Sequence, residues 1–365
     1  MRGIAQVGLG EFGQRHLEAW HRLGLGEQLW IVEADESRWG ETAQFRFPLG
    51  RIVRRLSDVL DQVDAVDIVA ATDLHAELLR STLSAGRDAF VAQPMTTNST
   101  QAREVAELAA RTGRLVQVGC SYRHHPISVR LKEEVGRGTF GAVRYVSGNF
   151  VGYRPARVDV GVMHGDGFHL LDLFNWLLDT SPSDAYAVCR DHFRRGLEDF
   201  AIALLTYPNE SVGKVEVGYI QPGRWQDRAF AGGTATKEIV IVGERAIAEA
   251  DFETGHLRMH EVRQEFKQGT WTPLTSGSRQ IPVEPCSPVK MICRELEAFL
   301  HGMETREPPP SGPVASGLNV ALLIEAIYES ARRAEPVRVE QVTVPDAPRP
   351  SGLLLKAPRK RGKAA

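Results

Sequence analysis

Three polar side chains in one short segment have the chemistry needed for proton transfer. His164, Asp166 and His169 lie close together in the sequence, and His169 falls on the first turn of a strongly apolar stretch, Phe168–Leu178. A histidine suits general acid–base chemistry because its ordinary pKa lies near neutral pH. We predict that His169 is the principal proton-transfer residue, with Asp166 or His164 orienting it.

A second pattern, near the N-terminus, is typical of phosphate binding. Directly after an apolar stretch, the sequence has the spacing G-x-G-x-x-G, formed by Gly8, Leu9, Gly10, Glu11, Phe12 and Gly13. In such a turn Gly8 makes the tight bend, Gly10 lets backbone approach a pyrophosphate, and Gly13 lets helix pack on strand. The free N–H groups at the start of the next helix then face the phosphates. We expect this turn to bind a dinucleotide.

An acidic residue about twenty positions after this turn would bind the ribose of the dinucleotide. Glu33 and Asp35 lie there, and we favour Glu33. A carboxylate at this place repels the 2′-phosphate of NADP, so NAD is the expected cofactor. Arg38 keeps NADP possible, because a nearby arginine could pair with that phosphate.

The first 122 residues contain the elements that would position this turn. Strands are expected at Ile4–Val7, Trp30–Val32, Ala65–Ala71, Ala89–Ala92 and Leu115–Gly119, and helices at Leu74–Ala85 and Ser99–Thr112. Strands that alternate with helices of about 10–15 residues form parallel sheets. We predict an α/β dinucleotide-binding domain, a doubly wound parallel sheet of the Rossmann type, over residues 1–122.

The pattern changes after residue 122. Helices are expected at Pro126–Gly136, Phe168–Leu178, Pro288–His301 and Val314–Arg333, and strands at Ala142–Phe150, Ala185–Cys189, Ala201–Tyr207, Val212–Tyr219 and Glu238–Val242. This pattern predicts an α+β domain over residues 123–341, with an antiparallel sheet that carries helices on one face. Residues 342–365 form a basic tail that we expect to be disordered.

The composition narrows the class of protein. The 365 residues include 44 lysines and arginines and 46 aspartates and glutamates, for a formal net charge of -2. Such a chain has no bulk electrostatic reason to bind nucleic acid or an anionic membrane. We find no apolar stretch that approaches the roughly 18–20 residues of a membrane span, no signal peptide and no cysteine framework. We therefore expect a cytoplasmic protein that binds neither nucleic acid nor membrane.

Taken in order along the chain, these motifs resemble those of the glucose–fructose oxidoreductase, inositol dehydrogenase and rhizopine-catabolism family. The matching features beyond the glycine turn are His16, Asp67–His75, Ala85-Gly86 before Pro94, Val118-Gly119 before Arg123 and Pro126, Gly167–Asp172 and Glu295–Phe299. The resemblance covers roughly residues 3–340.

The resemblance implies a Rossmann domain followed by a domain with a large open antiparallel sheet, and a nicotinamide dinucleotide in the cleft between them. It also implies that the substrate is a sugar, sugar acid or cyclitol that reacts at a carbinol, and that the protein forms a homodimer or homotetramer. By the same resemblance the cofactor is contacted by Ala70, Ala71, Thr72, His75, Gln93 and Pro94.

Two of the family's three proton-handling groups differ in this chain. The family uses a lysine within Glu-Lys-Pro, and an aspartate four residues before a histidine. Here the first motif reads Ala92-Gln93-Pro94, and Gly165 stands four residues before His169. No lysine precedes Lys132, so none replaces Gln93 by a shift in sequence, and a glutamine cannot titrate. We predict an NAD(P)-dependent oxidoreductase whose proton relay is centred on His169, with Gln93 as a hydrogen-bonding partner.

Residues after the last Rossmann strand are further candidates, because sites of parallel sheets lie at the carboxyl ends of strands. We include Tyr122 among the catalytic residues, and Arg123 and His124 among the residues that contact substrate. A surface or structural role is the alternative for His124 and His125.

Three charged residues near the histidine segment have two possible roles each. Arg154 and Arg157 could bind an acidic substrate, or could be solvated. Asp172 follows His169 by three positions, so it could hold that ring or pair within the core. His164, Asp166 and His169 have the residue types of metal ligands, but their spacing matches no trusted zinc motif, and we predict no metal.

Two other functions fit the altered motifs. The protein could be a non-catalytic dinucleotide-binding sensor, or the inactive partner of a working paralogue. Alternatively, a bound dinucleotide could oxidise the substrate transiently, so that the protein acts as a lyase or an epimerase.

Overall fold

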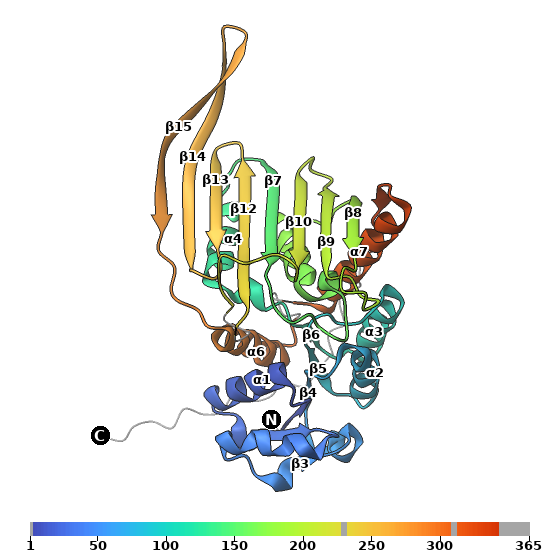
Figure 1. The fold of residues 1–365 in the computed structure, drawn as a ribbon. Coiled ribbons are helices and arrows are strands. Elements are labelled where there is room, and N and C mark those ends of the chain that lie inside the picture. Colours follow the sequence, from blue (N-terminus) through green and yellow to red (C-terminus); the bar gives the residue numbers. More distant parts are fainter. Residues whose placement is uncertain (1–2, 228–231, 308–311, 343–365) are drawn as a thin grey trace, which may run out of the picture.

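The computed structural model describes residues 3–227, 232–307 and 312–342, which form two parts, each built on its own sheet (Figure 1). The first sheet is parallel, in the order β3-β2-β1-β4-β5-β6. Its strands are β1 (Ile4–Val7), β2 (Leu29–Val32), β3 (Ile52–Val53), β4 (Ala65–Ile68), β5 (Asp88–Val91) and β6 (Val116–Val118). The chain runs outward from β1 to β3 and returns to β4 on the other side of β1, which is the doubly wound Rossmann order. The predicted fold class of this half is confirmed.

Three α-helices connect these strands: α1 (Glu11–Arg22), α2 (His75–Ser84) and α3 (Ser99–Thr112). Two residues determine the ends of α3. The Asn98 side chain accepts a hydrogen bond from the Gln101 N–H at the start, and Gly113, with a φ of 63°, ends the helix. The connection between β2 and β3 differs from the others, since Glu36–Phe45 forms consecutive 3₁₀ turns.

The second sheet has the order β15-β14-β13-β12-β7-β10-β9-β8-β16, with β11 paired to β12. Its strands are β7 (Val143–Val151), β8 (Asp184–Arg190), β9 (Phe200–Thr206), β10 (Val212–Gly218), β11 (Trp225–Gln226), β12 (Thr234–Gly243), β13 (Ala246–Asp251), β14 (His256–Lys267), β15 (Thr270–Ile281) and β16 (Val337–Arg338). All neighbours pair antiparallel except β7 and β10. The large, mainly antiparallel sheet is therefore confirmed.

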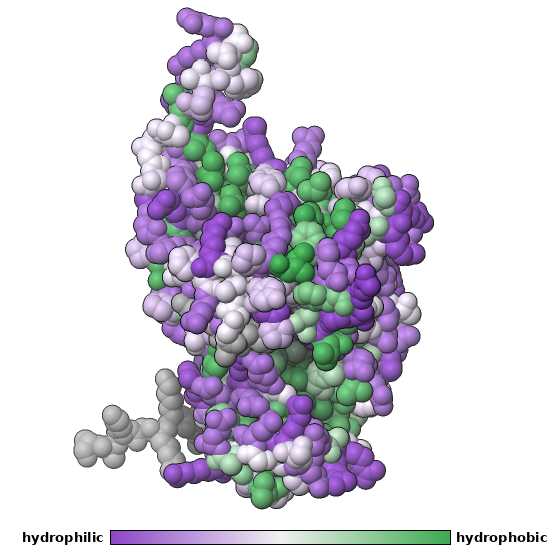
Figure 2. Space-filling view, viewed as in Figure 1, coloured by the Kyte–Doolittle hydropathy of each residue, from purple (hydrophilic) through white to green (hydrophobic). Residues whose placement is uncertain are grey.

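One face of this sheet is covered and the other is open. Ala201, Ala203 and Leu205 of β9 are fully buried, whereas Leu204 between them is 46% exposed. The covering helices include α4 (Pro126–Gly136), α5 (Phe168–Leu178) and α7 (Val314–Arg333), while α6 (Pro288–Thr305) packs against α1. In Figure 1 the open face is turned toward the viewer. Figure 2 shows apolar side chains scattered among hydrophilic ones on this face.

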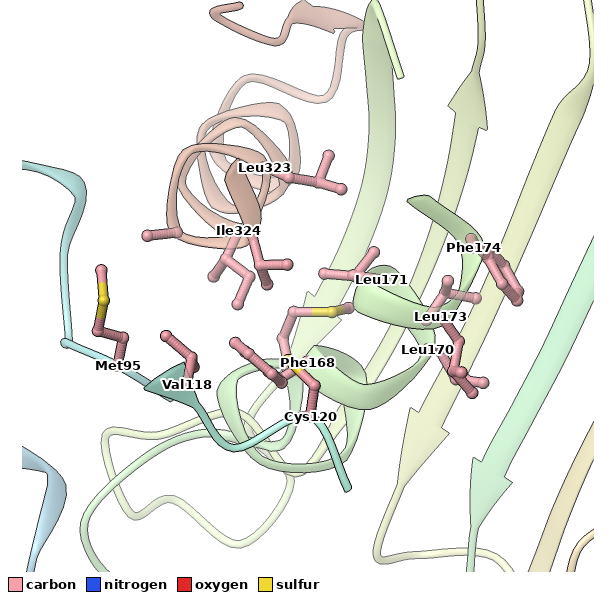
Figure 3. Packing of buried hydrophobic residues seen from close by; sticks show 14 of the residues in the cluster. Met95, Val118, Cys120, Phe168, Leu170, Leu171, Leu173, Phe174, Leu323 and Ile324 are labelled. Atoms are coloured by element: carbon pink, nitrogen blue, oxygen red, sulfur yellow. The ribbon is translucent and has the colours of Figure 1, made fainter. Parts of the chain in front are cut away.

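The core joins the two parts. Met95, Val118 and Cys120 from the Rossmann half pack with residues of α5 and α7, among them Phe168 and Ile324 (Figure 3). Side chains of α5 and of the first sheet therefore belong to one hydrophobic cluster. This packing fixes the start of α5 relative to the carboxyl ends of β5 and β6.

Helix α7 corrects one expectation from the sequence. By length and composition alone, Val314–Arg333 is long and apolar enough to cross a membrane. Of its most apolar stretch of 18 residues, 56% is buried inside the protein. Because α7 packs against β8, α3 and α5, its apolar character is that of a core helix.

Strands β13, β14 and β15 have no counterpart among the sequence predictions. Only Leu257 and Met259 at the start of β14 and Ile281 at the end of β15 are buried. The rest of the two strands lacks the alternation that marks a half-buried strand. The two strands form a long hairpin that projects beyond the rest of the sheet (Figure 1). The basic tail predicted for residues 342–365 lies outside the described residues, apart from Val342.

Candidate active site

The glycine turn is sterically tight at two positions and open at the third. Gly8 has a φ of 108°, and a Cβ there would lie 2.8 Å from the carbonyl oxygen of Val69. A Cβ at Gly13 would lie 2.3 Å from the carbonyl oxygen of Gly8. Gly10 has an ordinary φ of -59°, and a Cβ there would meet only Nη1 of Arg38, at 3.5 Å. The space before Gly10 is therefore available to a ligand.

A groove of about 990 Å³ runs past this turn at the carboxyl ends of β1, β2 and β4. The predicted cofactor residues that line it are Gly8, Gly10, Glu11, Phe12, Glu33, Asp35, Arg38, Ala70 and Ala71. The Glu33 carboxylate accepts hydrogen bonds from the backbone N–H groups of Leu9, at 2.9 Å, and Asp35, at 3.0 Å. Glu33 is thus fixed beside the glycine turn, where a ribose would lie. The Asp35 side chain instead caps the following turn through the Ser37 N–H.

A segment from the second part closes one side of the groove. Residues 155–159, which follow β7, line it. Nη2 of Arg157 lies 2.7 Å from the Asp159 carboxylate, and the Thr72 hydroxyl donates to the same carboxylate at 2.9 Å. Thr72 therefore ties this segment to the loop after β4.

His75 and Pro94, which were also predicted to contact the cofactor, instead hold loops in place. The ring nitrogens of His75 lie 2.9 Å from the Pro94 carbonyl oxygen and 3.0 Å from that of Ala70. His75 thus links the loops after β4 and β5. Neither His75 nor Pro94 lines the groove.

A smaller cavity of about 200 Å³ adjoins the groove, since Phe12, Pro155 and Arg157 line both. Gln93, from the loop after β5, and His169, from the first turn of α5, meet there. The Gln93 side-chain nitrogen lies 3.3 Å from Nε2 of His169. The Gln93 amide oxygen and Nδ1 of His169 are buried without a hydrogen-bond partner among the described residues. The structure thus brings together the two residues that the sequence analysis paired.

The surroundings of His169 keep its ring neutral. Its ring lies 4.8 Å from that of Tyr122, which also packs against Phe150 and Phe252. Burial lowers the pKa of His169 to about 4, although the carboxylates of Asp166 and Asp172 act in the opposite direction. Burial also raises the pKa of Tyr122. Both groups are therefore uncharged near neutral pH.

The expected orientation of His169 by Asp166 or His164 is not present. The Asp166 carboxylate is bonded to Arg154, and Nδ1 of His164 lies 2.9 Å from the Tyr328 hydroxyl. Within the described ranges, no group of three or more His, Cys, Asp or Glu side chains is arranged to hold a metal ion.

The glycine at position 165 also has a local explanation. Residues Met163–Gly167 form a single π-helical turn before α5. A Cβ at Gly165 would lie 3.2 Å from the Tyr219 hydroxyl and 3.5 Å from Cδ of Arg157. Tyr219, which follows β10, and Arg157 therefore occupy the space that a larger side chain at position 165 would need.

Three predicted substrate contacts lie elsewhere in the protein. Arg123 and Asp172 form a buried ion pair, with Nε of Arg123 2.8 Å from the carboxylate, so Asp172 pairs within the core and does not hold His169. His124 lies beside Arg294 at another surface depression, and His125 caps α4 by accepting the Ile127 N–H. Arg123, His124 and His125 follow β6 as predicted, but the chain turns away from the cavity after Tyr122.

Several residues that line the cavity were given no role by the sequence analysis, among them a lysine and a glutamate. Lys237 of β12 and Glu295 of α6 both line the cavity. Burial raises the pKa of Glu295 well above its ordinary value, which favours the neutral acid. The sequence does contain a sign of this position. Lys237 lies two residues before Ile239 and four before Ile241, so all three side chains point to the same, buried face of β12. A lysine at such a position is rare unless it is paired.

The groove fits a dinucleotide on its own geometry. The open space before Gly10, the uncapped N-terminus of α1 and the fixed carboxylate of Glu33 match a pyrophosphate and a ribose. Fold and site together define a two-part, dinucleotide-binding protein with a cavity that adjoins the dinucleotide groove.

Comparison with known proteins gives the family. Residues 2–120 match the oxidoreductase family with an NAD-binding Rossmann fold, and residues 132–339 match the C-terminal alpha/beta domain of that family. The chain belongs to the glucose–fructose oxidoreductase, inositol dehydrogenase and rhizopine-catabolism family, and it is an NAD(P)-dependent oxidoreductase.

Individual relatives resemble the chain over most of its length. D-apiose dehydrogenase of Paraburkholderia graminis is 25% identical over 93% of this chain and 90% of its own. Inositol 2-dehydrogenase of Rubrobacter xylanophilus is 24% identical over 94% of each. A solved structure of levoglucosan dehydrogenase with NADH and levoglucosan is 18% identical, with a TM-score of 0.76 over 93% of this chain and 99% of its own. That structural likeness shows a shared fold.

Proposed function

We propose that this protein catalyses the NAD-dependent oxidation of a carbinol of a neutral sugar or cyclitol, or the reverse reduction, and that His169 accepts the hydroxyl proton. The observation that carries this proposal is the contact of Gln93 with His169 in a cavity that adjoins the dinucleotide groove. The two side chains come from different parts of the fold, so the reacting carbon would lie where a nicotinamide and a proton acceptor meet.

The dinucleotide, when bound, supplies the acceptor for the hydrogen of the C–H bond and its electron pair. The chain must take the remaining proton. If the Gln93 amide N–H donates to Nε2 of His169, that nitrogen carries the lone pair. A substrate hydroxyl that displaces the amide would give its proton to Nε2 as the C=O bond forms.

Gln93 keeps a function after this displacement. Its amide has both a donor and an acceptor, and its oxygen is buried without a partner among the described residues. It would therefore hydrogen-bond a neighbouring hydroxyl or the nicotinamide amide. This role needs no change of charge, so glutamine suffices where a titrating group is not required.

The charges around the cavity favour a neutral substrate. Arg154 is bonded to Asp166 and lies 3.3 Å from Asp227, while Arg157 is paired with Asp159. Both guanidinium groups are therefore neutralised within the protein. This arrangement argues against the acidic substrate that Arg154 and Arg157 suggested. Two relatives named for neutral compounds, D-apiose and inositol, support the same class.

The test is a survey of substrates with purified protein and NAD. Appearance of reduced nicotinamide would be followed with sugars, cyclitols and sugar acids, in wild-type protein and in the His169→Ala and Gln93→Lys variants. The proposal predicts turnover of a neutral polyol by the wild type and loss of turnover in His169→Ala. Turnover only in Gln93→Lys, or none with dinucleotide still bound, would favour a non-catalytic binder.

We also propose that copies of the chain associate through the open face of the second sheet. Tyr186 and Leu204 are direct neighbours there and are 38% and 46% exposed, and Val212 is 41% exposed. Exposed apolar side chains on neighbouring strands of one face favour association. Light scattering of the wild type and of Leu204→Glu would test this, since the variant should reduce the molar mass to that of one chain.

A further inference from the structure

A buried lysine lies in the cavity that the proposed reaction uses. Lys237 is 8% exposed and belongs to the face of β12 that also buries Ile239 and Ile241. It pairs across the sheet with Phe150 of β7, whose ring packs against Tyr122. The ammonium group therefore reaches the cavity from the second sheet, whereas Gln93 reaches it from the first.

Two carboxylates hold this ammonium group. Nζ of Lys237 lies 2.7 Å from a Glu253 carboxylate oxygen and 3.9 Å from one of Asp227. Burial alone would lower the pKa of Lys237, but its interactions with Tyr122, Glu253 and Asp227 raise it above its ordinary value. An ammonium has three N–H donors, and the short contact with Glu253 needs one of them. Donors therefore remain for a ligand in the cavity.

The other side chains that line the cavity are less able than Lys237 to offer a positive charge to a ligand. Gln93 is neutral, and His169 is neutral because burial lowers its pKa to about 4. The guanidinium groups that line the cavity are engaged by other side chains. Arg15 is paired with Glu11, and Arg154 contacts two carboxylates. Arg157 binds Asp159 through two nitrogens and Thr72 through one. Lys237 has one short ionic contact.

We propose that Lys237 donates a hydrogen bond from its ammonium group to the substrate oxygen that changes from hydroxyl to carbonyl. This inference rests on the proposed function. As the hydroxyl proton passes to His169, negative charge grows on that oxygen, and a fixed ammonium stabilises it in a site with little water. Lys237 keeps its own protons throughout. Glu253 and Asp227 are positioning residues that hold the ammonium in place.

A role in charge stabilisation must be separated from a role in folding. Lys237→Met alone removes the ammonium group that lies 2.7 Å from the buried Glu253 carboxylate, which destabilises the protein whatever Lys237 does in the reaction. The double variant Lys237→Met/Glu253→Gln removes both charges and should recover most of the lost thermal stability. Glu253→Gln alone keeps the ammonium. Lys132→Met is the matched control, because Lys132 of α4 is a partly buried lysine outside the cavity that is likewise held by a carboxylate, that of Asp179.

The experiment measures turnover of the polyol found for the wild type, the dissociation constant of NADH and the melting temperature in all five proteins. We expect the double variant to melt near the wild type and to bind NADH within about twofold, while kcat falls about 10²–10³-fold, as on loss of one oxyanion donor. Lys132→Met should keep full activity, and Glu253→Gln should keep most of it.

Two outcomes would overturn the inference, and they are distinguishable. A double variant with near wild-type kcat would show that Lys237 serves folding only, and would leave the proposed function intact. A wild-type protein that binds NADH but turns over no substrate would overturn the proposed function, and this inference with it.

Discussion

The side-chain nitrogen of Gln93 lies 3.3 Å from Nε2 of His169, across the junction between the two parts of the protein. This contact joins the loop after β5 to the first turn of α5. Neither partner is charged near neutral pH, since an amide does not titrate and burial lowers the pKa of His169 to about 4. The pair therefore offers a neutral proton acceptor beside a neutral hydrogen-bonding group.

The pH dependence of turnover should reflect this low pKa. His169 acts as a base only when it is unprotonated, and with a pKa of about 4 it is unprotonated throughout the physiological range. We expect kcat/KM for carbinol oxidation to show no His-dependent fall between about pH 8 and pH 5.5. A descending limb near pH 6.5 in the wild-type profile would contradict this description of the ring.

The glycine turn allows a paired test of cofactor binding. Gly10→Ala should fold normally, because the φ at Gly10 is ordinary and its Cβ would meet only the end of Arg38, but the methyl group should weaken NADH binding at least tenfold. Gly13→Ala should instead lower the melting temperature, because its Cβ would lie 2.3 Å from the Gly8 carbonyl oxygen. Fluorescence titration and thermal melts would distinguish the two. Unchanged NADH affinity in Gly10→Ala would place the pyrophosphate elsewhere.

Glu33 should set the preference for NAD over NADP. Its carboxylate is fixed by the N–H groups of Leu9 and Asp35, and Arg38 lines the same groove. Glu33→Ser should weaken NAD binding and strengthen NADP binding, because it removes a ribose acceptor and a charge that repels phosphate. Dissociation constants for both dinucleotides would be measured by calorimetry. An unaltered ratio of the two constants would contradict the assignment of Glu33.

Acid should destabilise the fold through its buried histidines. Burial is the largest cause that lowers the pKa of His124, His164 and His169, each to about 4. The unfolded chain then binds more protons below about pH 6.5, so the stability that these groups contribute is present above that pH and is lost toward pH 4. Each group adds at most about 1.4 kcal/mol per pH unit in this window.

Urea unfolding at several pH values would measure this effect in wild-type protein and in His124→Asn, which removes one titrating ring outside the cavity. The variant should show a shallower fall in the free energy of unfolding between pH 6.5 and pH 4. Parallel curves would mean that His124 is not buried in its neutral form.

The sequence predicted the elements with strong local signals. Helix Ser99–Thr112 matches its predicted bounds because Asn98 and Gly113 cap it. Helix Phe168–Leu178 has no side-chain cap at its start, and its run of apolar residues marks it instead. The hairpin of β14 and β15 was missed because neither strand buries a continuous apolar face. Local patterns therefore predicted five of the six Rossmann strands and five of the ten strands of the second sheet.

The site was predictable only where its residues lie in one motif. The glycine turn, Glu33 and His169 could be named from spacing. Lys237 could not be assigned to the cavity, because its position depends on the pairing of β12 with β7, far apart in sequence. For the same reason Arg123 was wrongly predicted to contact the substrate. Its partner Asp172 lies on α5, far away in the sequence.

The most direct test of an NAD-dependent oxidation follows the carbinol hydrogen itself. A polyol carrying deuterium on the reacting carbon would be incubated with the protein and NAD, and the reduced dinucleotide and sugar product would be examined by mass spectrometry. We expect deuterium in the reduced dinucleotide and a carbonyl product in equal amount. Deuterium that returns to an epimerised or dehydrated product, with no net reduced dinucleotide, would contradict the account and indicate transient oxidation.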